Sequence, residues 1–154
     1  MGKENPNVFV YNAIIRGFFH SFPPFKALEC YVHMLKAQVC PSSYTFSSLV
    51  KGCTLVSASR LGSGVHGQIW RFGFCSHVYV QTSLIDFYSS LSKINESRQV
   101  FDEMPERDSF ASNYMISANV RADDMDSARA LFCLIRCLRG IRLRGILSLM
   151  GMLE

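Results

Sequence analysis

The chain of 154 residues has room for one domain, and its 49% hydrophobic and 18% charged residues exclude an intrinsically disordered protein. Most of the net charge of +4 lies in residues 135–154, which carry four arginines and one glutamate, so the rest of the chain lacks a strong basic field. No apolar run approaches the ~20 residues of a membrane-spanning helix, and we expect no membrane partner. No signal or transit peptide is visible.

Helical spacing of apolar residues follows a short polar leader at residues 1–7. Asn7 is placed to cap the first helix, Ser42 or Ser43 to cap the third, and Gly73 to end the fourth. Prolines at 23, 24, 41 and 105 punctuate the pattern. Helices are expected at about 8–20, 25–37, 43–55, 60–72 and 110–120, with two more between 78 and 104 and one after the aspartates at 123–126.

The chain repeats itself at a fixed interval. VYNAIIRGF at Val10 returns as TFSSLVKGC at Thr45, VQTSLIDFY at Val80 and ASNYMISAN at Ala111, with offsets of 35, 35 and 31 residues. A column of small residues recurs at the same offsets, as expected where two helices of one unit approach closely: Ala27, Gly62, Ser97 and Ala128. Such a period predicts an all-α solenoid of about four stacked helix–turn–helix units.

The units resemble plant pentatricopeptide repeats of the PLS subclass, as in the phrases Tyr11-Asn12-Ala13-Ile14-Ile15 and Val100-Phe101-Asp102-Glu103-Met104-Pro105. The resemblance divides the chain into a P-type repeat at 8–42, an L-type repeat at 43–77, an S-type repeat at 78–108 and a partial repeat at 109–135. Residues 136–154 form a non-repeat basic and apolar tail, typical of a truncated member. The resemblance implies a right-handed superhelical solenoid that binds single-stranded RNA in a mitochondrion or chloroplast, one base per repeat.

Recognition positions follow from the same resemblance. Second positions flank a base, and here they are all aromatic: Phe9, Tyr44, Tyr79 and Phe110. Fifth and last positions read the base, and they are the polar residues Asn12, Ser47, Thr82 and Asn113 with Ser42, His77 and Asp108. The competing interpretation is structural: the aromatic rings would attach each helix to its neighbour, and the short polar groups would cap helices.

No catalytic or metal-binding pattern is recognisable. The six cysteines have neither CxxC nor zinc-ligand spacing, and we expect them to be free thiols. The His-x-Glu and Pro-Cys-x-x-Cys pattern of the deaminase extension carried by some PLS relatives does not occur. We therefore expect no enzyme activity, no cofactor, no metal and no small-molecule substrate.

Two alternatives to RNA recognition remain open at this stage. A protein-binding scaffold of tetratricopeptide type shares the Ala128-x-x-x-Phe132 spacing, although its units would be a uniform 34 residues. The unusual tail is also compatible with a non-functional remnant. If the chain binds organellar RNA, proteins of the editing or processing machinery are expected partners.

Overall fold

The computed structural model describes residues 7–20 and 25–139, and within these ranges it contains eight α-helices and no strand. The helices are α1 (Val8–His20), α2 (Phe25–Lys36), α3 (Ser43–Leu55), α4 (Ser59–Arg71), α5 (Val78–Ser90), α6 (Ile94–Asp102), α7 (Ser109–Arg121) and α8 (Met125–Arg139). The all-α solenoid predicted from the sequence is confirmed. Most predicted ends lie within one residue of the observed ones, whereas α6 ends three residues before Pro105.

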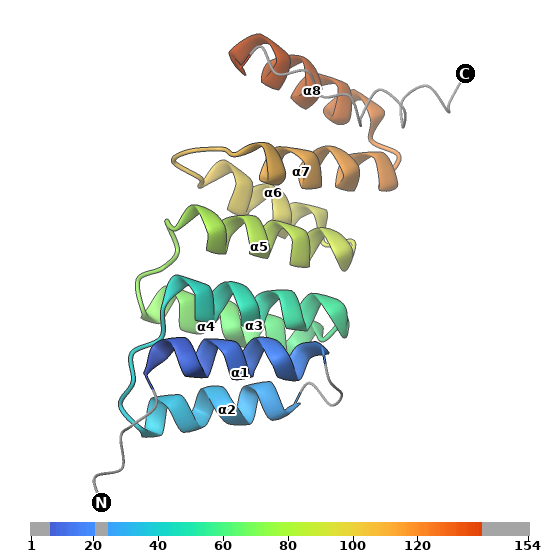
Figure 1. Cartoon of the computed structure of the whole chain (residues 1–154). Helices are drawn as coiled ribbons and strands as arrows, with labels where there is room; N and C mark the ends of the chain where they lie inside the picture. The colour runs from blue at the N-terminus through green and yellow to red at the C-terminus, as the bar shows by residue number, and fades with distance from the viewer. Residues whose placement is uncertain (1–6, 21–24, 140–154) are drawn as a thin grey trace, which may run out of the picture.

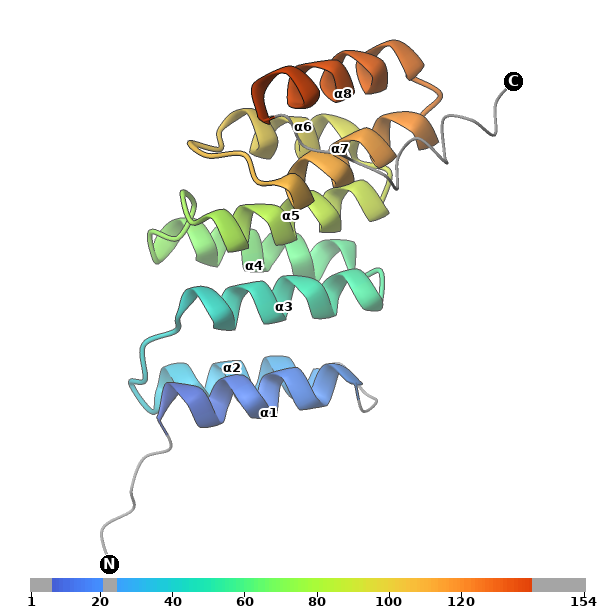
Figure 2. The ribbon, with the colours of Figure 1, turned by 45° about the horizontal axis from the view of Figure 1, so that its top comes forward.

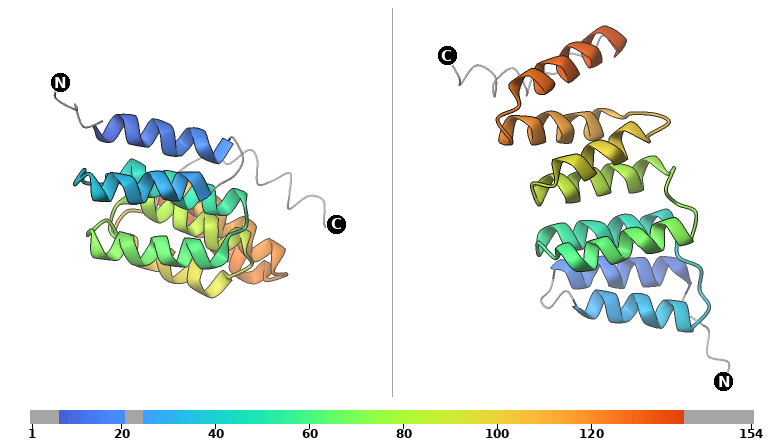
Figure 3. Two further views of the ribbon diagram at one scale, coloured as in Figure 1. Left: turned by 90° about the horizontal axis from the view of Figure 1, so that it is seen from below. Right: turned by 180° about the vertical axis from the view of Figure 1, so that it is seen from behind.

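The helices stack as successive hairpins, with α1 and α2 at one end and α8 at the other (Figure 1). The first helices of the hairpins form one layer, in which α3 packs against both α1 and α5, and α5 packs against α7. The view in Figure 2 has this layer in front, and the view from behind in Figure 3 brings α2, α4 and α6 forward. Residues at equivalent positions of α1, α3, α5 and α7 therefore lie in columns along one face of the stack.

Short polar side chains cap the first turns of several helices. Asn7 Oδ1 accepts hydrogen bonds from the backbone amides of Phe9 (3.1 Å) and Val10 (3.2 Å) at the start of α1. Ser42 caps α3, and Asp124 Oδ1 accepts from the amide of Ser127 (3.0 Å) in the first turn of α8. The three caps satisfy amides that lack a partner within the helix, which explains why the sequence located these starts correctly.

Left-handed backbone conformations end most of the helices. Gly73 has φ +75° after α4, and its amide donates to the carbonyl of Trp70 (3.1 Å). Four non-glycine residues adopt the same region of φ after other helices: Gln38, Ser57, Ser92 and Asp123. Glycine adopts this conformation without the steric cost that a Cβ imposes, so these four positions carry local strain.

The core runs along the interior of the stack. Its fully buried large side chains come mostly from the first helices: Ile15, Phe46, Leu49, Val50, Leu84, Ile85, Phe87 and Met115. A second, smaller cluster of Ile116, Ala128 and Ile135 joins α7 to α8. The stability of such an array resides mainly in these contacts within and between adjacent hairpins.

The column of small residues is buried at all four positions, Ala27, Gly62, Ser97 and Ala128. Two of them also face the following unit, which the sequence did not predict. The Ser97 hydroxyl contacts α5 of its own unit, at the carbonyl of Ile85 (3.2 Å), and Met115 Sδ of α7 (3.1 Å). At Gly62 an added Cβ would collide with the ring of Phe87 in α5. These two small residues therefore lie at junctions with the next hairpin.

The predicted unit boundaries at 42, 77 and 108 fall in the segments between hairpins, and the division into P, L and S types stays a prediction. Helix α8 continues to Arg139, so the first four residues of the predicted tail belong to this helix. The rest of the tail (140–154) and leader residues 1–6 lie outside the described residues.

Candidate nucleic-acid interface

A column of exposed aromatic side chains follows the first turns of α1, α3, α5 and α7. Their exposed fractions are 76% for Phe9, 70% for Tyr44, 65% for Tyr79 and 67% for Phe110. Rings that attached one helix to the next would be largely buried, so this exposure favours contact with a ligand over the structural interpretation. One large apolar face per unit is thus available to a flat ligand on the same side of the stack.

The polar residues beside the first aromatic ring form a network across two units. Asn12 Nδ2 donates to Ser42 Oγ (3.2 Å), and Thr45 Oγ1 donates to Asn12 Oδ1 (2.6 Å). Ser42 also caps α3, with its Oγ accepting from the amide of Thr45 (3.4 Å). Fifth and last positions of the first unit are therefore in contact, as the resemblance implies, and Ser42 has the capping role as well.

Thr45 is a member of this network that the sequence analysis missed. Its Oγ1 accepts from the backbone amide of Ser42 (3.0 Å), which completes a reciprocal capping box. The signal was present in the spacing Ser42-x-x-Thr45, the interval between the two members of such a box. Thr45 is fully buried, so it does not face a ligand itself, but its hydrogen bond to Asn12 fixes the orientation of the Asn12 amide.

The third unit repeats the paired arrangement with a charged partner. Thr82 Oγ1 lies 3.2 Å from Asp108 Oδ2 and also donates to the carbonyl of Val78 (2.8 Å). Asp108 Oδ1 accepts from the amide of Ala111 (2.7 Å) and so caps α7. The Asp108 carboxylate thus joins the third and fourth units: Oδ1 caps α7, and Oδ2 faces Thr82 at the fifth position of the third unit.

The second unit departs from this arrangement. Ser47 and His77 share no hydrogen bond, and Ser47 Oγ and His77 Nδ1 are both buried without a partner. His77 precedes α5 but does not cap it, and its ring lies among aromatic neighbours, with centroids 6.3 Å from Phe74 and 6.0 Å from Tyr79. In the fourth unit, Asn113 Oδ1 is likewise buried without a partner.

The charged side chains of this face lie one helical turn after the fifth positions. Arg16, Lys51 and Asp86 each lie four residues after a fifth position, on the same side of α1, α3 and α5. Burial raises the pKa of Asp86, and the nearby charges of Lys51 and Arg121 oppose that rise. Arg121 Nη2 also donates to the carbonyl of Ser89 (3.3 Å), which anchors it between α5 and α7.

Two histidines outside the face have structural partners. His66 Nδ1 lies 2.7 Å from the Tyr88 hydroxyl, and His33 Nδ1 lies 2.8 Å from the Tyr11 hydroxyl. Burial lowers the pKa of His66, an effect that Glu103 partly opposes. The hydrogen bond to Tyr88 joins His66 of α4 to α5.

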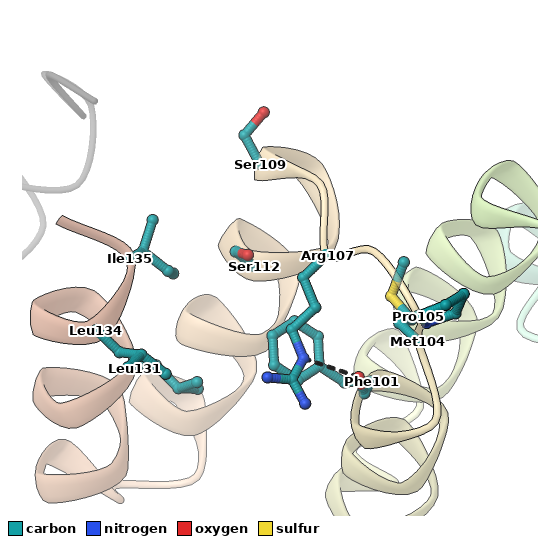
Figure 4. Close-up of a pocket in the computed structure, with 9 residues that line it drawn as sticks. All are labelled: Phe101, Met104, Pro105, Arg107, Ser109, Ser112, Leu131, Leu134 and Ile135. Atoms are coloured by element: carbon teal, nitrogen blue, oxygen red, sulfur yellow. Dashed lines mark hydrogen bonds between the residues drawn. The ribbon is translucent and has the colours of Figure 1, made fainter. Parts of the chain in front are cut away.

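An open pocket of about 330 Å³ lies between α6, α7 and α8 (Figure 4). Arg107 crosses it, with its guanidinium carbon 4.7 Å from the ring centroid of Phe101 and its Nε donating to the Phe101 carbonyl (3.2 Å). The remaining lining is mostly apolar: Met104, Pro105, Ser109, Ser112, Leu131, Leu134 and Ile135. None of these nine side chains is a carboxylate, imidazole or thiol, so the lining supplies no acid–base pair.

Within residues 7–20 and 25–139, no cluster of three or more His, Cys, Asp or Glu side chains could hold a metal ion. Five cysteines have described side chains and are free: Cys30, Cys40, Cys53, Cys75 and Cys133. Burial raises the pKa of Cys53 to about 11. No helix in this part of the chain is long and apolar enough to cross a membrane.

Comparison with known proteins identifies the repeats. Residues 6–54 match the family described as PPR repeat family, and residues 82–109 and 110–139 each match the PPR repeat. Three relatives come from Arabidopsis thaliana. Pentatricopeptide repeat-containing protein At1g06143 is 55% identical over 122 residues, which are 79% of this chain and 21% of the relative. Those named At1g59720, chloroplastic/mitochondrial, and At1g08070, chloroplastic, are 38% and 35% identical over 84% and 68% of this chain.

The chain spans 20% and 14% of the length of these last two relatives, and so about a fifth or less of all three. Family matches nevertheless cover most of its own length, on both sides of the α4–α5 connection. The matched segments contain three of the four exposed rings, Phe9, Tyr44 and Phe110, whereas α4 and Tyr79 lie between them. The chain belongs to the pentatricopeptide repeat family.

Proposed function

We propose that this chain binds single-stranded organellar RNA, with one base per repeat unit, in support of RNA editing or another maturation step. The observation that carries the proposal is the column of four aromatic rings, exposed by 65–76%, beside the polar pairs Asn12–Ser42 and Thr82–Asp108. Stacking of a base on an aromatic ring contributes ~1–3 kcal/mol, and polar groups alongside can then discriminate between base edges.

The pair Thr82 and Asp108 favours guanine. A carboxylate only accepts hydrogen bonds, and guanine offers adjacent N1–H and N2–H₂ donors on its Watson–Crick edge. Adenine presents an acceptor at N1, which the carboxylate repels. Each carboxylate oxygen has two lone pairs, so Asp108 keeps acceptor capacity after bonding to Ala111 and Thr82. The recognition rule of the family likewise assigns guanine to this pairing.

The other units extend the footprint. Asn12 with Ser42, and Asn113 in the fourth unit, resemble pyrimidine-preferring combinations, whereas Ser47 with His77 has no clear preference. The proposed footprint from 5′ to 3′ is pyrimidine, any base, guanine, pyrimidine. Four units supply only a few stacking contacts, and association costs absorb much of that free energy, so we expect weak binding by this chain alone.

Asp108→Asn tests the assignment. Asparagine caps helices as well as aspartate does, so α7 should stay intact while the amide supplies a donor that aspartate lacks. Binding curves for RNAs that differ only at the third base should move from guanine toward adenine by ~1–3 kcal/mol. Glu29→Gln, which removes the same charge from the exposed surface of α2, should leave the preference unchanged. An unaltered preference in Asp108→Asn would reduce Asp108 to a capping residue.

We assign the alternating units to the PLS subclass, with P, L and S types at 8–42, 43–77 and 78–108. The names of two relatives place those proteins in the chloroplast or in chloroplast and mitochondrion, which supports an organellar site of action for this chain. Proteins of the editing or processing machinery are the proposed partners, and they would supply any chemistry performed on the bound RNA.

A further inference from the structure

We propose that Arg16 of α1 and Lys51 of α3 form a phosphate-binding row that holds the RNA backbone over the first two units, and that this row stops at Asp86 of α5. The inference rests on the proposed RNA-binding function and adds to it the path of the backbone. It assigns to the two cations a sequence-independent role, distinct from that of the base-reading residues.

Position along the helices carries the first part of the argument. Arg16 and Lys51 lie four residues after Asn12 and Ser47, a step of about 6 Å along an α-helix on the same side. A base and its own phosphate are separated by a distance of this order, so a nucleotide stacked at the second position can direct its phosphate toward this next turn. Both cations are exposed. No salt bridge within 4.0 Å occupies either one among the described residues.

The acidic residue at the equivalent position ends the row. Asp86 lies four residues after Thr82, and the charges of Lys51 on one side and Arg121 on the other both act on it. Asp108 contacts Thr82 itself (3.2 Å), so a second carboxylate lies at the fifth position of the same unit. At this position of the first helices the side chain is therefore a cation in α1 and α3 and a carboxylate in α5.

This change of charge along the face separates binding of the RNA backbone from recognition of a base. Over the first two units the backbone is attracted, and this compensates for the polar pair that the second unit lacks. Over the third unit the carboxylates repel phosphate and leave the guanine edge as the favourable contact. Phosphate contacts position a strand without reading its sequence, whereas base contacts specify it.

The test is the salt dependence of RNA binding by the full chain, because each phosphate contact on a single strand adds ~0.7 to the slope of log K against log salt. Arg16→Gln and Lys51→Gln should each reduce the magnitude of the slope by ~0.7 and weaken binding equally for RNAs with guanine or adenine at the third base. Asp86→Asn should bind more tightly at low salt. Arginines of the tail contribute equally to every variant and cancel in the comparison.

Matched controls are the exposed cations of the second helices. Lys26→Gln in α2 and Arg60→Gln in α4 remove the same charges from the other layer and should leave the slope unchanged. Equal slope changes in test and control variants would overturn the phosphate row and leave only a diffuse charge effect. Base-selective binding with unaltered slopes in Arg16→Gln and Lys51→Gln would overturn the row while leaving the proposed function standing. Absence of RNA binding by the unmodified chain would overturn both.

Discussion

The ring of Phe87 in α5 occupies the space that a side chain at Gly62 in α4 would need. The repeat position of Phe87 is occupied by small residues in the other units: Gly17, Gly52 and Ala118. The repeat position of Gly62 is occupied in the other units by residues that have a Cβ: Ala27, Ser97 and Ala128. The third unit thus carries a large residue in a column of small ones, and the second unit compensates by losing its Cβ. The larger side chain in the third unit thus fills the space left by the missing side chain in the second unit.

Substitution of Gly62 should reveal this coupling. Gly62→Ala forces the fully buried Phe87 ring to move, and we expect it to destabilise the fold by ~1–3 kcal/mol despite the better helix propensity of alanine. Gly64→Ala in the same helix, where a Cβ meets nothing within 4 Å, should instead stabilise by up to ~1 kcal/mol. Urea unfolding measures both. In a Phe87→Leu background the cost of Gly62→Ala should shrink, and purely additive effects would contradict the coupling.

Left-handed turn residues offer a second stability test. Ser57 and Ser92 are exposed, have φ of 51° and 59°, and end α3 and α5. Replacing either with glycine removes the steric cost of the Cβ and should stabilise the fold by up to ~1 kcal/mol, net of the chain entropy that glycine adds. Gly73→Ala, at φ 75°, is the reverse experiment and should destabilise. Thermal melts that rank the three variants in any other order would refute the strain argument.

How far the sequence predicts this fold can be judged from such positions. Caps and turns are local, so Asn7, Ser42 and Gly73 could be assigned from neighbouring residues alone. The Gly62–Phe87 contact joins residues from different units, and nothing near either one indicates it. At the candidate site the aromatic column was predicted, but its exposure was not, because an aromatic ring on a helix fits burial and display equally well. The spacing from Ser42 could have revealed Thr45 as a capping partner, but its contact with Asn12, 33 residues away, could not be read from the local sequence.

Stability should fall with acidification through the titration of His66. Burial lowers its folded-state pKa below the ordinary ~6.5, so the unfolded chain binds more protons in the interval between the two values. The free energy of unfolding then rises with pH across that interval and declines as pH drops from about 6.5 toward the folded-state value. His66→Asn can preserve the contact with Tyr88 without titrating. Urea unfolding between about pH 5.5 and 7 should show a shallower slope for this variant, and an unchanged slope would exclude His66 as its source.

Removal of an exposed ring should separate binding from stability. Tyr44 is 70% exposed, so Tyr44→Ala should change the free energy of unfolding by less than ~0.5 kcal/mol while weakening RNA binding by ~1–3 kcal/mol. Trp70→Ala removes a comparably exposed ring (59%) from α4, in the other layer, and should leave RNA binding unaffected. Fluorescence anisotropy with a labelled RNA measures both variants. Equal losses of affinity would show that the aromatic column has no special role.

The shortness of α6 has a consequence for how the array moves. This helix has nine residues where the other seven described helices have 12 to 15, and an open apolar gap follows it beside α8. In a repeat array each hairpin is stabilised only by its neighbours. The last hairpin, α7 and α8, is attached to the rest chiefly by the packing of α7 against α5. Amide exchange in α8 should accordingly be faster than in α5. An RNA bound along the first helices would therefore contact a rigid surface as far as Thr82 and a less firmly held hairpin beyond Asp108, so the register of the RNA would be set mainly by the first three units.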